Sequence, residues 1–87
     1  MKEITMFTME SCPHCQRAHR WMAEAFEKHP EYKEIPLTII DEVEQPDLAN
    51  EYDYYYVPTY YVGGEKVHEG VASPEIIENM FSFAIKN

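Results

Sequence analysis

The sequence predicts an α/β fold whose elements follow the order β-α-β-α-β-β-α. A short apolar and β-branched segment, Ile4–Thr8, leads into a stretch in which apolar residues recur at helical spacing. Farther on, a Gly-Gly pair separates two strand-like segments, and Ser73-Pro74 marks the start of another helix. The chain has 87 residues, of which 45% are hydrophobic. Because this suffices for one small core, we expect a single domain over residues 1–87.

The first half of the chain predicts two strands and two helices. Ile4–Thr8 is the first strand, and residues 9–11 form the loop after it. Residues 13–28 predict a helix, because Pro13 suits a first helical position and His29-Pro30 is a stop signal. The apolar stripe of this helix is Cys15, Ala18, Met22, Ala25 and Phe26. Residues 35–40 indicate a second strand, followed by an acidic linker and a short helix over residues 46–52.

The second half predicts a hairpin and a final helix. Residues 59–62 and 66–69 are the hairpin strands, and Gly63-Gly64 supplies the positive φ angles that a tight turn requires. The last helix begins with Ser73 as N-cap, Pro74 in the first position and Glu75 near the positive end of the helix dipole. Its expected core stripe is Ile77, Met80, Phe81 and Ala84.

The charge balance restricts the partners. Seven Lys and Arg against sixteen Asp and Glu give a formal charge of −9, which repels nucleic-acid backbones. No segment approaches the roughly 20 apolar residues of a membrane span, and no signal-peptide pattern follows Met1. We therefore expect a cytoplasmic monomer that binds proteins or small thiols, and neither nucleic acid nor membrane. The acidic stretch over residues 42–53 is interpreted as a solvated face.

The motif Cys12-Pro13-His14-Cys15 contains the only two cysteines of the chain. A four-thiolate metal site needs more thiols than one chain offers, and a disulfide closing so short a loop constrains little of the unfolded chain. Redox chemistry is therefore the leading hypothesis. A metal- or iron–sulfur-binding module, in which a dimer pools two such motifs, remains the alternative from another class.

The order of motifs resembles the thioredoxin superfamily, in its compact branch of glutaredoxin size. The resemblance rests on the strand before Cys12-Pro13-His14-Cys15, on Val57-Pro58-Thr59, and on the hairpin turn Gly63-Gly64. It implies a thioredoxin fold with a four-stranded mixed sheet in the order 2-1-3-4, flanked by three helices. Strands one and two would be parallel, with the hairpin antiparallel to them. It also implies a thiol–disulfide oxidoreductase that acts on protein disulfides.

The resemblance assigns a substrate site as well. It implies that the Val57-Pro58 bond is cis, that Pro58 faces the cysteines, and that the backbone of Val57 pairs with an extended substrate peptide. Val57, Pro58 and Thr59 are therefore the candidate substrate-binding residues. The plainer interpretation is that Pro58 only begins the edge of a strand.

The chemistry of exchange gives the two cysteines different roles. A thiolate must attack, and a second thiol must release the mixed disulfide. Because Cys12 lies at a helix N-terminus, where the dipole favours a thiolate, we expect it to be the nucleophile. Cys15, one turn later on the apolar stripe, is the expected resolving thiol. The Cys12–Cys15 disulfide is the redox group, and no other cofactor is expected.

The dipeptide Pro13-His14 bears on the reduction potential. If His14 adds positive charge beside Cys12, it stabilises the reduced form and makes the disulfide a better oxidant. The same pair is typical of the oxidising DsbA family, so a potential above that of thioredoxin is expected. Arg17, His19 and Arg20 could act similarly, although a solvated helix face explains them equally well.

Some positions differ from the related families. Glutaredoxins hold glutathione with a base before the first cysteine and an Asp before the last helix, where this chain has Met9-Glu10-Ser11 and Gly70-Val71-Ala72-Ser73. A glutathione-dependent glutaredoxin is thus the alternative function, and the electron donor is either glutathione or a flavoenzyme reductase. Met6 stands where thioredoxins bury an Asp as proton acceptor for the resolving cysteine. Glu10, His14 and water remain open for that role.

Aromatic side chains precede the substrate motif. Tyr54, Tyr55 and Tyr56 come directly before Val57, where they either cover the small core or contact substrate. Trp21 is interpreted as packing against the core or at the edge of the groove.

Overall fold

A four-stranded sheet in the order β2-β1-β3-β4 runs through the computed structural model, which describes residues 1–87. β1 (Ile4–Thr8) pairs in parallel with β2 (Leu37–Asp41) and antiparallel with β3 (Thr59–Val62). β3 forms an antiparallel hairpin with β4 (Glu65–Glu69). The expected mixed sheet and its 2-1-3-4 order are confirmed.

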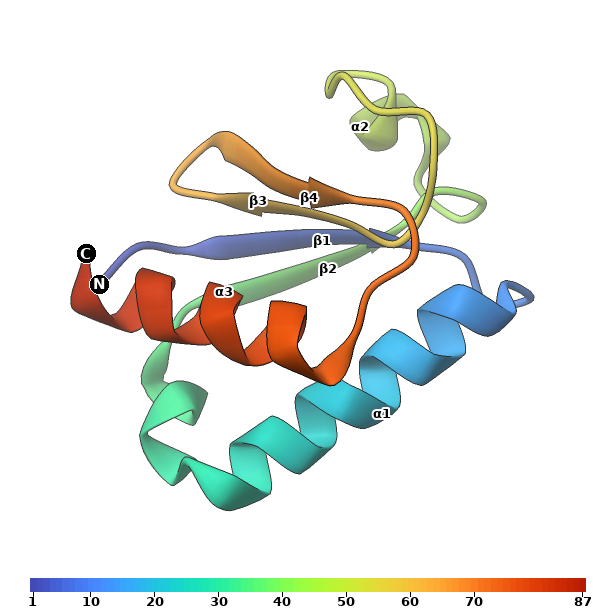
Figure 1. Cartoon of the computed structure of the whole chain (residues 1–87). Coiled ribbons are helices and arrows are strands. Elements are labelled where there is room, and N and C mark those ends of the chain that lie inside the picture. The colour runs from blue at the N-terminus through green and yellow to red at the C-terminus, as the bar shows by residue number, and fades with distance from the viewer.

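Helices lie on both sides of this sheet. α1 (Pro13–Lys28) and α3 (Pro74–Lys86) cover one face, and the short α2 (Pro46–Ala49) lies beyond the other (Figure 1). The two termini lie side by side, since the amide of Lys2 donates to the carbonyl of Ala84 at 2.9 Å (Figure 1). The opposite end of the molecule carries the loop from β1 to α1.

The alternation of side chains in β1 divides the core into two parts. Ile4 and Met6 point toward α1 and α3, where the larger hydrophobic cluster lies, whereas Phe7 packs with Ile40 and Tyr61 on the α2 side. Thr8 is therefore on the same face of the sheet as Ile4 and Met6, and it faces the beginning of α1. This placement matters for the candidate site.

Several expected boundaries were wrong, and β4 begins at Glu65 rather than at residue 66. The second strand begins at Leu37 rather than at residue 35, because a 3₁₀ helix, η1 (Pro30–Glu34), precedes it and Pro36 has no amide proton for the sheet. α2 ends at Ala49 rather than at residue 52. The ring of Tyr52 instead packs 4.7 Å from that of Phe7, centroid to centroid.

The predicted turn and cap are present. Gly63 and Gly64 have φ angles of 59° and 87°, in the region that favours glycine. The hydroxyl of Ser73 accepts a hydrogen bond from the amide of Ile76 at 3.1 Å and caps α3. The core stripe expected for α3 is buried: Ile77, Met80, Phe81 and Ala84. None of the helices has the length and apolar character needed to cross a membrane.

Candidate active site

Cys12 is the N-cap residue of α1, in an extended conformation with φ −90° and ψ 116°. Its amide donates to the carbonyl of Met9 at 3.1 Å, so the loop turns back on itself just before the helix. Pro13 follows at the start of the helix, where its missing N–H leaves no intrahelical bond unmade. The thiol of Cys12 is partly exposed and points to the carbonyl oxygen of Val57, 3.9 Å away.

The surroundings of Cys12 favour its thiolate. Desolvation opposes ionisation, but the amides of Cys15 and His14, the thiol of Cys15 and the charge of Arg17 outweigh it. The pKa of Cys12 therefore lies below the ordinary thiol value. These are the unpaired amides of a helix N-terminus, which the sequence predicts at this position.

Cys15 has the opposite environment. The residue is fully buried, and this burial raises the pKa of its thiol, although the Thr8 hydroxyl and the Met9 amide partly offset the shift. The neighbouring Cys12 raises it further. The two thiols of the motif are thus distinguished by exposure and by the direction of their pKa shifts.

Val57, Pro58 and Thr59 lie across from Cys12. The Val57–Pro58 peptide bond is cis. Pro58 and Thr59 are buried, and the hydroxyl of Thr59 donates to the carbonyl of Tyr56. The side chain of Thr59 thus holds the loop together, which leaves the partly exposed Val57 as the member of the motif nearest the thiol.

Of the three tyrosines before Val57, one packs against the core and two are exposed to solvent. Tyr54 covers the core: its ring stacks 4.7 Å from that of Phe7, and its hydroxyl donates to Glu42 at 2.8 Å. Tyr55 and Tyr56 are 86% and 71% exposed. Aromatic surface therefore lies in the segment that leads to Val57.

Glu69 fixes this segment to the hairpin. Its carboxylate accepts hydrogen bonds from the amides of Tyr55 and Tyr56, at 2.5 and 2.9 Å, and pairs with Lys66 at 2.8 Å. The hydrogen bond from Lys66 and those from the two amides lower the pKa of Glu69 to about 2. Glu69 is thus ionised at neutral pH, and it holds the backbone that carries the exposed rings of Tyr55 and Tyr56.

Positive charge near Cys12 comes from Arg17. Its guanidinium lies within hydrogen-bonding distance of Nδ1 of the exposed His14. The backbone amide of His14 also lowers the pKa of Cys12, and its ring contacts Arg17. The expectation that His14 itself adds positive charge stays a prediction.

Two further side chains belong to the surroundings of Cys15: Thr8, which was missed from the sequence, and His19, which was considered there only for its charge. Oγ1 of Thr8 lies 3.1 Å from Nε2 of His19, and Thr8 also stabilises the thiolate of Cys15. His19 is half-buried, so the solvated face expected for it was wrong. Two signals in the sequence could have indicated this. The alternation of side chains along β1 puts Thr8 on the same face as Met6, and His19 follows Cys15 by four residues, so both lie on one side of the helix.

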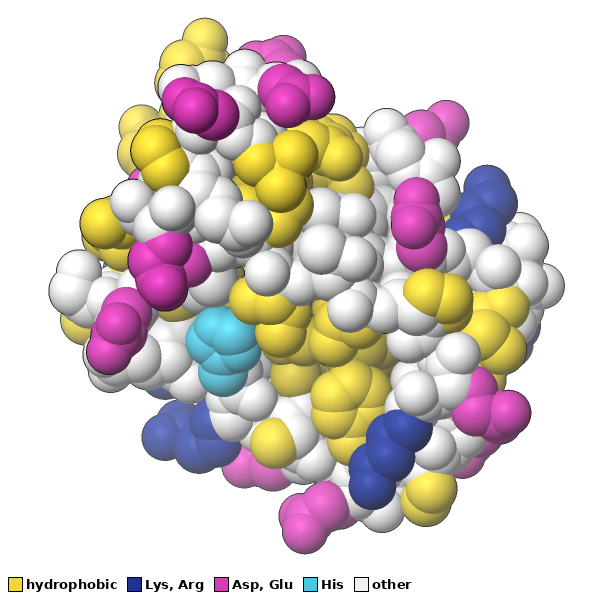
Figure 2. Space-filling model, turned by 180° about the vertical axis from the view of Figure 1, so that it is seen from behind, with side chains coloured by type: hydrophobic (Ala, Val, Ile, Leu, Met, Phe, Trp, Pro, Cys, Tyr) yellow, Lys and Arg dark blue, Asp and Glu magenta, His cyan; other side chains and the backbone are white.

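Among the charged side chains of the chain, sixteen are acidic and seven are Lys or Arg. Acidic side chains gather around the α2 end of the face seen from behind, with hydrophobic side chains between them and the opposite end (Figure 2). No group of three or more His, Cys, Asp or Glu side chains is arranged to hold a metal ion. A metal or cluster module would therefore need ligands from a second chain.

Comparison with known proteins agrees with this site. A family model for the thioredoxin domain matches residues 2–82. The chain belongs to the thioredoxin family. A thioredoxin from Methanocaldococcus jannaschii is 32% identical to it over 75 residues, which cover 86% of each chain. As a member of this family, the protein is a thiol–disulfide oxidoreductase.

Solved thioredoxin structures share the fold. The thioredoxin of Trypanosoma brucei brucei superposes with a TM-score of 0.73 at 17% identity, covering 100% of this chain and 77% of its own. Mitochondrial thioredoxin 3 of Saccharomyces cerevisiae, in its oxidised form, gives 0.72 at 21% identity, covering 94% and 77%. The architecture is thus that of a thioredoxin fold, at somewhat shorter length.

Proposed function

We propose that the protein reduces or exchanges disulfides in protein substrates, with Cys12 as nucleophile and Cys15 as resolving thiol. The observation that carries the proposal is the contrast between the two sulfurs. Cys12 is accessible, has a lowered pKa and lies 3.9 Å from the Val57 carbonyl, whereas Cys15 is buried with a raised pKa. Cys12 is therefore the thiol that is suited to attack a substrate disulfide first.

The reaction proceeds in two displacements. The Cys12 thiolate attacks one sulfur of the substrate disulfide, a new S–S bond forms, and the other substrate sulfur leaves as a thiolate. Cys15 then attacks the Cys12 sulfur, closing the Cys12–Cys15 disulfide and releasing the remaining substrate thiolate. Two electrons pass to the substrate, and the Cys12–Cys15 pair is the only redox group required.

The segment beside Cys12 suits an extended peptide. In the proposed complex, the backbone of Val57 pairs with the substrate chain and brings its disulfide to Cys12. The hydroxyl of the buried Thr59 donates to the carbonyl of Tyr56 and so holds the segment that contains Val57. The exposed rings of Tyr55 and Tyr56 extend this surface, where aromatic side chains contribute strongly to protein recognition.

A trapping experiment tests the roles of the thiols. The Cys15→Ser variant should accumulate mixed disulfides between Cys12 and substrate proteins in its host cell, because the resolving thiol is missing. Non-reducing gels and mass spectrometry would identify them. The matched Cys12→Ser variant should trap little or nothing, and equal trapping by both variants would show the assigned roles to be wrong.

The proposal also specifies an electron donor, a flavoenzyme of the thioredoxin-reductase type. Glutaredoxins hold glutathione with a base in the loop before the first cysteine, where this chain has the exposed Glu10, and residues 70–73 contain no Asp for the glutathione amine. In a disulfide-reduction assay, we expect faster turnover with NADPH and such a reductase than with glutathione and glutathione reductase. Faster turnover with glutathione would favour the glutaredoxin alternative.

The proposed couple is more oxidising than that of thioredoxin. The helix amides and Arg17 stabilise the thiolate of Cys12, which lowers the free energy of the reduced form. We place this activity in a cytoplasmic monomer.

A further inference from the structure

The resolving step requires Cys15 to lose a proton while it is out of contact with solvent. Cys15 has no exposed surface, and its burial raises the pKa of its thiol. At neutral pH the thiol is therefore protonated when the mixed disulfide forms. A group within the protein must accept the proton for the attack to be fast.

Thr8 and His19 lie where such a group is needed. His19 follows Cys15 by one turn of α1, on the same side of the helix. Thr8 is the last residue of β1, on the face of the sheet that α1 covers, and is only 6% exposed. Its hydroxyl lies 3.1 Å from Nε2 of His19, and the same hydroxyl is close enough to Cys15 to lower the pKa of that thiol.

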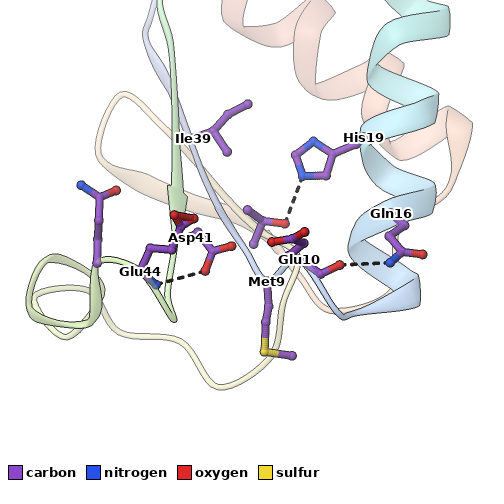
Figure 3. A pocket seen from close by; sticks show the side chains of 9 residues that line it. Met9, Glu10, Gln16, His19, Ile39, Asp41 and Glu44 are labelled. Atoms are coloured by element: carbon purple, nitrogen blue, oxygen red, sulfur yellow. Dashed lines mark hydrogen bonds between the residues drawn. The ribbon is translucent and has the colours of Figure 1, made fainter.

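Beyond His19 the site opens to solvent. His19 and Thr8 line an open pocket of about 610 Å³ between the start of α1 and the end of β2. Figure 3 shows His19 reaching from α1 toward β1, with Glu10, Asp41 and Glu44 around the same space. A proton held on the imidazole therefore has a direct path to water, which the buried thiol lacks.

We propose that His19, acting through the Thr8 hydroxyl, accepts the proton of Cys15 during the resolving step and releases it to water in the pocket. The inference rests on the proposed roles of Cys12 and Cys15. As the Cys15–Cys12 bond forms, the Cys15 proton moves to Oγ1 of Thr8, whose own proton moves to Nε2 of His19. The substrate sulfur leaves as a thiolate, and its negative charge is balanced by the positive charge of the protonated His19.

His19 is suited to this task at neutral pH. Burial lowers the pKa of its imidazole, so the ring is neutral and its Nε2 can accept the Thr8 hydroxyl proton. The titratable groups that face it are Cys15 on α1 and, around the pocket, Glu10, Asp41 and Glu44. The three carboxylates do not offset the effect of burial, which is the cause of the shift.

The test measures the resolving step by itself. Reduced protein is mixed with the chromogenic disulfide 5,5′-dithiobis(2-nitrobenzoate), and stopped-flow absorbance follows two releases of thionitrobenzoate. The first reports attack by Cys12, and the second reports resolution by Cys15. In His19→Gln, which keeps a hydrogen bond to Thr8 but takes no proton, we expect the second release to slow at least about tenfold at pH 7.

The pH profile distinguishes a proton acceptor from a structural role. In the wild type, the rate of the second release should fall only when the pH drops below the pKa of His19. In His19→Gln, this rate should rise with pH. The two rates should become equal at high pH, where Cys15 ionises without a proton acceptor. Thr8→Val should behave like His19→Gln, and Thr8→Ser should restore the wild-type profile. His29→Gln, at the far end of α1, is the matched control and should leave both phases unchanged.

Each outcome bears on the proposal. A second phase in His19→Gln equal to that of wild type at every pH would overturn the role of His19 and leave the proposed function standing. A slowing in His19→Gln that is equal at every pH would overturn it as well, and so would a Thr8→Ser variant that is as slow as Thr8→Val. If the wild type shows no second release, both the proposed function and the role of His19 are wrong.

Discussion

Iodoacetamide added to the reduced protein at neutral pH should modify Cys12 at least about 100-fold faster than Cys15. Two effects act in the same direction. The pKa of Cys12 is lowered and that of Cys15 is raised, and each pKa unit changes the thiolate fraction about tenfold below the pKa. Cys15 is in addition fully buried, so the reagent cannot reach it. Peptide mapping by mass spectrometry measures the two rates.

The pH dependence of this alkylation tests the cause of the shift. The rate at Cys12 should reach half of its maximum below about 8.5, the value for free cysteine, and fall about tenfold per pH unit below that midpoint. Removing the nearby charge in Arg17→Gln should move the midpoint up, and His14→Gly should do the same by releasing Arg17. The control Arg20→Gln, an exposed change on the same helix, should leave it in place. A midpoint at the free-cysteine value would contradict the assigned environment.

Much of the fold could be predicted because local signals are strong in this chain. Pro13 and Ser73 mark helix starts, and Gly63-Gly64 marks a hairpin turn, each for a reason that depends on neighbouring residues only. The sheet order came from the resemblance to a family rather than from periodicity. The start of β2 was misplaced because Ile35 is apolar and β-branched like a strand residue, although its burial occurs after a 3₁₀ helix.

The parts of the site that escaped prediction are contacts across the fold. Cys12 and Cys15 are close in sequence, and their asymmetry follows from one helix end. The link from Thr8 to His19 depends on how α1 lies on β1, and the pairing of Arg17 with His14 depends on rotamers on an exposed helix face. The sequence could therefore show that positive side chains follow the cysteines, but it could not show which of them affects the pKa of Cys12.

Phe81→Ala should destabilise the protein by about 3–5 kcal/mol. Phe81 is fully buried in α3, and its ring lies 5.0 Å from that of Phe26 and 5.4 Å from that of Tyr32, centroid to centroid. These contacts join α3, α1 and η1 beneath the sheet. A domain of this size has a total stability on the order of 5–15 kcal/mol, so the loss is a large fraction of it. Urea unfolding followed by circular dichroism measures the change.

Phe83→Ala is the matched control for this loss, because the same side chain is removed two residues away on the same helix. Phe83 is 44% exposed, and its one polar contact is the ammonium of Lys2, 5.9 Å from the ring centroid. A cation–π contact at an exposed site contributes about 0.5–1 kcal/mol, so the control should cost much less than Phe81→Ala. Phe81 packs against Phe26 near the C-terminal end of α1, whereas Cys12 caps its N-terminus. Phe81→Ala should therefore shift the unfolding midpoint, while alkylation of Cys12 in the folded protein keeps its midpoint pH. Equal destabilisation by the two variants would show that the contacts of Phe81 do not hold α3 against α1.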